Sequence, residues 1–146
     1  MDRALNYLAL AQKAGEAALG EEPVASAARA LHAHLILVAS DASDHTWRRA
    51  RSLTAGTQQQ CLRVRFTKAE MGFVVGRTSL AIAAIEDVGL ALSLVEALGE
   101  PEKYAAAADA LRQRKDKQLQ RKAEAKAHAR NKRFGKRWIA EDKKEK

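Results

Sequence analysis

The chain has 146 residues, one cysteine and a formal net charge of +8 at pH 7. The single cysteine excludes an internal disulfide and a thiolate metal cluster, and with no secretory pattern at the N-terminus it leads us to expect a cytoplasmic protein. No apolar run approaches the ~18 residues that a membrane-spanning helix needs, so no membrane association is predicted.

The charge is divided unevenly along the chain. Residues 1–111 contain 11 Lys and Arg against 13 Asp and Glu, whereas residues 112–146 contain 15 against 5. A near-neutral body followed by a basic arm is typical of nucleic-acid binding, and less often of binding to an anionic membrane. A solvated, charged helix without a partner is the plainer alternative.

The first part of the chain alternates helices with a buried strand. Asp2 is the expected N-cap of a helix that ends at Gly15, and a second helix is predicted over Glu22–His32. Leu35–Val38 is a continuous apolar run, which indicates a strand covered on both faces. Ser43 then resembles the N-cap of a third helix.

The next part repeats this alternation. Residues 61–66 alternate apolar and polar positions, as in a half-exposed strand, and Thr67–Glu70 forms a capping box for a short helix. A second wholly apolar strand is predicted over Leu80–Ile85, followed by a helix that Asp87 caps and Gly99 ends. These elements predict an α/β sandwich with helices on both faces of the sheet.

A last helix should begin at Pro101. Tyr104, Ala108 and Leu111 can dock on the body, but the apolar stripe fails from Arg112 onward. We therefore expect a boundary near residue 99, with residues 100–146 forming a charged C-terminal helix or a disordered tail.

Four segments resemble the kink-turn-binding ribosomal protein superfamily (L-seven-Ae type), and most closely its bacterial YlxQ-like branch. In chain order they read LALAQKAG, GEEPVASAARAL, LILVASDAS and MGFVVGRTSLAIAAI, and the likeness runs from about Ala4 to Leu98. The resemblance implies a three-layer α/β/α sandwich around a mixed four-stranded sheet. It also implies an RNA-binding domain over residues 1–99 that recognises sharply bent, structured RNA, with ribosomal RNA and the ribosome among the candidate partners.

Members of this family contact RNA through three segments: the start of the second helix, the loop after the following strand, and the loop before the last core strand. A glycine at a helix start lets the backbone approach a sugar-phosphate surface, and the N–H groups there suit anionic acceptors. Carried over by position, the RNA-binding candidates are Gly20, Glu21, Glu22, Pro23, Ser26, Asp41, Ala42, Ser43, Gly76, Arg77, Thr78 and Ser79.

The second helix departs from the family pattern. Relatives typically carry Asn and Glu at the positions of Glu22 and Pro23, and Lys at the position of Ser26, whereas Arg29 is the cation one turn further on. Two carboxylates at Glu21 and Glu22 repel phosphates. The sequence therefore leaves two functions open: an RNA-binding protein, or a protein-interaction module of the same fold that has lost kink-turn recognition.

The end of the chain interleaves aromatic and basic residues. Aromatic rings can stack on unpaired bases while the cations neutralise phosphates. A frayed terminus, or a helix that folds back through Trp138 and Ile139, is the alternative. The predicted tail contacts are Arg130, Lys132, Arg133, Phe134, Lys136, Arg137 and Trp138.

Other polar residues carry no clear chemistry. Arg63 and Arg65 are expected to cover a helix or face water, and His32 and His34 lack the neighbouring ligands of a metal site. We find no phosphate-cradling loop, no nucleophile elbow and no acid pair, so we predict neither an enzyme nor a cofactor. The sequence does not indicate an oligomeric state.

Overall fold

The computed structural model describes the backbone of residues 2–145 and the side chains of residues 2–130. It contains two compact units, Met1–Arg112 and Gln113–Lys146. The first unit is an α/β fold around one mixed sheet, in which the strand order is β1-β4-β2-β3. The strands are β1 (Ala17–Leu19), β2 (Leu35–Val38), β3 (Gln60–Arg63) and β4 (Ile82–Ile85).

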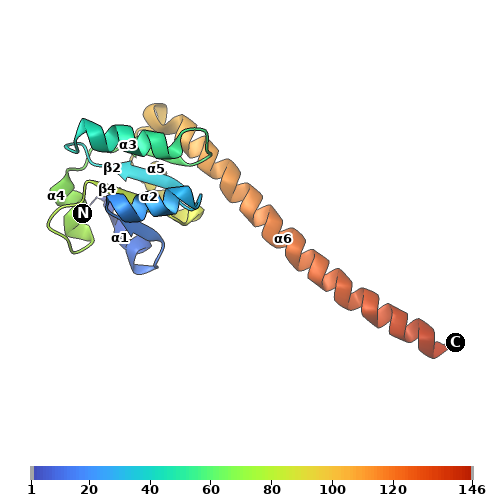
Figure 1. The fold of residues 1–146 in the computed structure, drawn as a ribbon. Coiled ribbons are helices and arrows are strands. Elements are labelled where there is room, and N and C mark those ends of the chain that lie inside the picture. Colours follow the sequence, from blue (N-terminus) through green and yellow to red (C-terminus); the bar gives the residue numbers. More distant parts are fainter. Residues whose placement is uncertain (1, 146) are drawn as a thin grey trace. The chain divides into compact units, whose positions relative to one another are not determined.

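Helices cover both faces of the sheet, which confirms the predicted three-layer architecture (Figure 1). Helices α2 and α3 pack together on one face, and α1 and α5 pack together on the other. The helices are α1 (Arg3–Lys13), α2 (Glu21–Arg29), α3 (Asp44–Thr54), α4 (Lys68–Val74), α5 (Val88–Ala97) and α6 (Pro101–Glu145).

The two central strands form the middle of the core. Every residue of β2 and β4 is buried, as the two wholly apolar runs predicted. β4 is antiparallel to both of its neighbours, β1 and β2, whereas β2 and β3 are parallel. A Leu-to-Ala change in such a core typically costs about 2–5 kcal/mol, so these strands fix the position of everything attached to them.

The sheet register brings four strand ends to one edge. Leu19 at the end of β1 is opposite Ala83, and Val38 at the end of β2 is opposite Ile82 at the start of β4. Val38 is also paired with Arg63 at the end of β3. The segments that follow β1 and β2 and the segment that precedes β4 therefore leave the sheet at the same edge.

Side-chain caps begin four helices where the sequence predicted them. Asp2, Ser43 and Asp87 each accept a hydrogen bond from a first-turn amide, of α1, α3 and α5 respectively. Thr67 and Glu70 form a complete capping box at α4. These contacts are local, because a capping side chain reaches only two or three residues along the chain.

The second helix is shorter than predicted and ends at Arg29. Leu31 takes a left-handed conformation with φ 62°, and the amide of His32 donates to the carbonyl of Ala27. Together with the bond from the Leu31 amide to the Ala28 carbonyl, this is a Schellman C-terminus. Glycine usually marks that position, so a leucine there gave no signal in the sequence.

Strands β3 and β4 are also shorter than predicted, at Gln60–Arg63 and Ile82–Ile85. Both pair with β2, and β2 is only four residues long. The amide of Val64 still donates to the carbonyl of Val38, but beyond it the chain bonds to a loop, because the amide of Ser40 donates to the carbonyl of Phe66. Because β2 pairs with both strands, its length limits how far β3 and β4 extend.

The start of α6 belongs to the first unit. Tyr104, Ala107 and Leu111 are buried, and the hydroxyl of Tyr104 donates to the carbonyl of Arg63 at 3.5 Å. Residues 116–130 of the same helix are exposed throughout. Within the described residues, no helix is both long enough and apolar enough to cross a membrane.

We predict that Leu31→Gly stabilises the protein. Leu31 is exposed, so little packing is lost, and glycine removes the strain of a Cβ in the left-handed region, which is worth about 1 kcal/mol. Chemical denaturation of the variant should show the gain. Leu31→Ala is the control, because it keeps the Cβ and should gain nothing; equal effects of the two substitutions would contradict this account.

The N-cap of α1 is also an ion-pair partner. Asp2 accepts from the amide of Ala4 at 2.9 Å and from Arg65 Nη2 at 2.6 Å. Burial by itself would raise the pKa of Asp2, but these hydrogen bonds and the positive charge of Arg65 outweigh it and hold the pKa below the usual 3.8. The carboxylate therefore stabilises the fold above its usual pKa, and that contribution is lost as the pH falls through the lowered value.

We expect Asp2→Ala to reduce the free energy of unfolding at pH 7 by about 1–2 kcal/mol, because it removes both the cap and the ion pair. Asp2→Asn should cost less, since asparagine still caps. Urea denaturation between pH 7 and about 2 should show the advantage of aspartate over asparagine disappear on acidification. A difference that does not change with pH would refute the charge contribution.

Candidate nucleic-acid interface

The three predicted RNA-binding segments lie at the single sheet edge defined above. The start of α2 follows β1, the segment Asp41–Ser43 follows β2, and the segment Gly76–Ser79 precedes β4. Strand register alone brings them together, because the last residues of β1 and β2 both lie opposite the first residues of β4. We call these three segments the candidate interface.

Gly20 joins two parts of the candidate interface. Its φ of 96° is in the region that favours glycine, and its amide donates to the carbonyl of Ile82 at the start of β4. A Cβ at this position would lie 3.7 Å from Nη1 of Arg77, so the guanidinium of Arg77 lies beside the start of α2. No side chain caps α2, which leaves the helix start free to meet an external acceptor.

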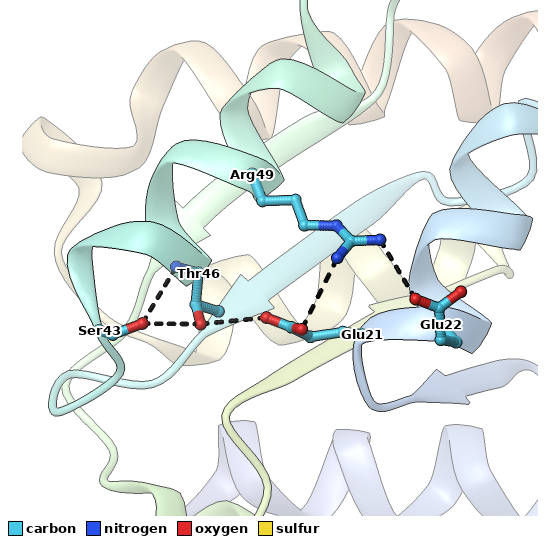
Figure 2. Close-up of polar contacts among 5 residues, drawn as sticks. All are labelled: Glu21, Glu22, Ser43, Thr46 and Arg49. Carbon is cyan, nitrogen blue, oxygen red and sulfur yellow. Dashed lines mark hydrogen bonds and ion pairs between the residues drawn. The ribbon is translucent and has the colours of Figure 1, made fainter.

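The two acidic residues at the start of α2 are held by α3 (Figure 2). Glu21 accepts from the hydroxyl of Thr46 at 3.2 Å and lies 3.8 Å from Arg49 Nη1. Arg49 Nη2 also binds Glu22, at 3.3 Å. The guanidinium offsets part of the negative charge that the sequence had placed against phosphates, and Glu21 is turned toward the protein.

Thr46 and Arg49 were not among the predicted site residues. They are three positions apart on α3, and such residues share a helix face. That spacing was visible in the sequence, but nothing in it indicated that the face would meet α2.

Residues Asp41–Ser43 combine exposure with structural roles. Asp41 is exposed and its Oδ1 accepts from the amide of Lys68 at 2.8 Å, at the start of α4. Ala42 is buried, and its carbonyl accepts from Arg63 Nη2 at 2.7 Å. Ser43 is exposed, caps α3 and contacts the hydroxyl of Thr46 at 3.0 Å. The side chains of Asp41 and Ser43 are therefore the accessible part of this loop.

All four residues of Gly76–Ser79 are exposed. The loop is bonded to α4, because the carbonyl of Gly72 accepts from the amide of Arg77 at 2.8 Å. A Cβ on Gly72 would lie 2.8 Å from the carbonyl oxygen of Arg77 and 2.8 Å from the amide nitrogen of Ser79. Only glycine lets the backbone of α4 and the loop approach this closely, which fixes the position of Arg77 at the edge.

The remaining candidates of α2 lie along its outer surface. Glu22, Pro23, Ser26 and Arg29 are exposed, whereas the opposite side of the helix packs against the sheet. Glu22, Ser26 and Arg29 follow one another at helical spacing, so they share a face. Arg29 is the last residue of the helix, which puts its charge at the end of α2 away from Gly20.

Arg63 and Arg65 bind the protein itself. Arg63 lies over the ring of Trp47 at 5.8 Å and 4.0 Å from Asp44, in addition to its bond to Ala42. Arg65 Nη1 donates to the carbonyl of Leu98 at 2.6 Å. Both side chains cover neighbouring elements, in agreement with the structural role expected from the alternating strand.

A groove of about 530 Å³ adjoins the candidate interface along β3, with Trp47, Cys61 and Lys103 among its lining residues. Burial raises the pKa of the Cys61 thiol to about 12 despite the nearby charge of Arg51, so the thiol is neutral at physiological pH. Within residues 2–130, no three His, Cys, Asp or Glu side chains gather in a way that could hold a metal ion.

Of the predicted tail contacts, Arg130 is exposed on α6. The other six lie outside the residues whose side chains the structure describes: Lys132, Arg133, Phe134, Lys136, Arg137 and Trp138.

Comparison of the sequence with models of known protein families finds no match, and comparison with curated proteins finds none either. Among solved structures, the chain is similar to a Bacillus halodurans protein of unknown function. The two share 24% sequence identity at a TM-score of 0.64, over 68% of this chain and 100% of the other. At that identity the likeness shows the fold alone.

We predict that Gly72→Ala destabilises the protein by about 1–3 kcal/mol, because the new methyl group meets backbone that cannot move without displacing the loop. Gly89→Ala is the matched control: it is also helical, and its Cβ would meet only the Asp87 side chain, at 3.2 Å. The control should cost much less than Gly72→Ala, since alanine favours helix and the Asp87 carboxylate that caps α5 can shift by a few tenths of an ångström, whereas backbone cannot. Equal thermal unfolding of the two variants would contradict the tight approach at Gly72.

Proposed function

We propose that this protein binds sharply bent, structured RNA at the candidate interface, in the manner of the kink-turn-binding family that its sequence resembles. The observation that carries the proposal is the meeting of Gly20 and Arg77 at one sheet edge. It joins an uncapped helix start to a cation, and both favour phosphate and base-edge acceptors.

The polar groups around this point suit irregular RNA. Thr78 and Ser79 are exposed, and their short hydroxyl side chains can donate to or accept from splayed base edges, whereas the Ser43 hydroxyl is engaged with Thr46. Arg77 supplies the planar, multiply donating cation that recognises phosphate bidentately. Side chains recognise RNA sequence mostly at unpaired bases that are splayed out of the stack, so this arrangement favours a bend.

The contacts between the start of α2 and α3 affect which groups at the candidate interface can recognise RNA. Glu21 is held by Thr46 and Arg49, whereas Glu22 is bridged to Arg49 at the exposed surface, and neither carboxylate adds a donor for RNA. Recognition then depends on backbone amides, Arg77 and the shape of the edge. The basic helix α6 adds phosphate contacts without sequence choice. We propose a cytoplasmic, non-enzymatic protein, with ribosomal RNA as a candidate target.

The test compares the affinity of the full chain for a kink-turn RNA with its affinities for a straight, fully paired RNA and for an unstructured RNA of equal length. We expect preference for the bent RNA, and a loss of about tenfold on Arg77→Ala, because one bidentate contact is worth roughly 1–3 kcal/mol. Lys13→Ala is the control, since Lys13 is an exposed cation at the end of α1, outside the candidate interface.

Equal weakening by Arg77→Ala and Lys13→Ala would contradict the site. Equal binding of bent and straight, fully paired RNA would leave only the contribution of α6. No RNA binding at all would favour the alternative, a protein-interaction module of the same fold. The acidic first turn of α2 supports that alternative, because the Glu22 side chain is 80% exposed.

A further inference from the structure

The part of α6 that lies in the second unit carries much more positive than negative charge. Residues 113–130 contain seven Lys and Arg against two Asp and Glu. The large hydrophobic residue in this stretch is Leu119, which is 55% exposed. A helix without an apolar stripe cannot form a coiled coil or lie on a membrane through its hydrophobic face. Its partner must therefore be recognised by charge.

The cations occupy one continuous side of the helix. At 3.6 residues per turn they span an arc of about 220°, and the remaining arc contains both acidic residues together with small or amide side chains. Gln120 donates to Glu124 at 3.2 Å on this acidic side. The basic arc consists of the half-buried Arg114 and Lys115 and the exposed Lys117, Arg121, Lys122, Lys126 and Arg130.

The width of the basic arc indicates the shape of the partner. An arc wider than half a turn puts cations on both flanks of the helix as well as on its front. A flat or single-row anionic surface would use only the front. Two rows of phosphates on either side of a groove would use both flanks, with the acidic side turned to solvent. Double-helical nucleic acid presents such rows.

We propose that residues 113–130 bind as an intact helix along the groove of a double-helical RNA segment, with the basic arc reaching the phosphates on both sides. The stretch is about 27 Å long at 1.5 Å per residue, and long Lys and Arg side chains can reach the phosphates without the helix entering a narrow groove. The inference rests on the proposed function, because it takes RNA as the partner.

A flexible polycation would not need this arrangement. Disordered arms bind phosphates through net charge, and the order of charges along them has no helical period. Single-stranded RNA is bound with the help of stacking aromatic residues, and residues 113–130 contain no Phe, Tyr or Trp. Segregation of the two acidic residues from seven cations matters only if the helix meets its partner on one side.

Two double variants of the full chain separate these cases, because each lowers the net charge by the same amount. Lys122→Gln with Lys126→Gln removes two positive charges from the basic arc. Gln120→Glu with Ala127→Glu adds two negative charges to the acidic side. All four positions are exposed. The probe is a fully paired RNA duplex, measured across a salt series, with circular dichroism confirming that both variants remain helical.

We expect the basic-arc variant to lose about tenfold in affinity and to reduce the salt slope by about 2, because two phosphate contacts disappear. The acidic-side variant should bind nearly as the unmodified protein does. Equal losses in the two variants, or tighter binding of duplex DNA than of duplex RNA, would overturn the inference.

The outcome is separate from that of the proposed function. The duplex has no bend, and neither variant touches the candidate interface of the first unit. A loss of bent-RNA preference with a retained difference between the two variants would refute the proposed site alone. If the preference for bent RNA is retained and the two double variants bind the duplex equally, only the role of α6 would be refuted.

Discussion

The antiparallel pairing of β4 with both β1 and β2 is the constraint on which the candidate interface depends. Because β4 begins where its two neighbours end, the loop before it meets the segments that follow them. The close approach of Gly72 to the backbone of Arg77 and Ser79 then fixes the position of that loop relative to α4. Without this pairing, Gly20 and Arg77 would have no reason to be adjacent.

The proposed function divides the physical tasks of binding between the two units. The first unit is close to neutral, and its exposed edge combines hydroxyl groups, a helix start and one guanidinium, while its acidic residues are held by α3. Such a surface can discriminate shape but attracts a polyanion weakly. Residues 113–130 carry the opposite balance, with seven Lys and Arg against two Asp and Glu. In the proposed function, charge in residues 113–130 raises a salt-dependent affinity, while the shape of the sheet edge provides selectivity.

Local patterns explain most of the fold that could be predicted. The caps at Asp2, Ser43 and Asp87 and the two wholly apolar strands depend on neighbours a few residues away or on burial of every side chain. The end of α2 could not be predicted, because Leu31 occupies a left-handed position that glycine usually marks. The ends of β3 and β4 depended on the length of β2, which is a property of the partner strand.

The sequence by itself determined the helix starts, the central strands and the concentration of positive charge in α6, because each of these is encoded in residues close together in the chain. Only the tertiary structure decided what the polar residues of α2 do. Thr46 contacts Glu21 across 25 residues, and Arg49 binds Glu22 across 27. Those contacts exist because α2 and α3 pack side by side on one face of the sheet, and no local pattern specifies which helix faces will meet.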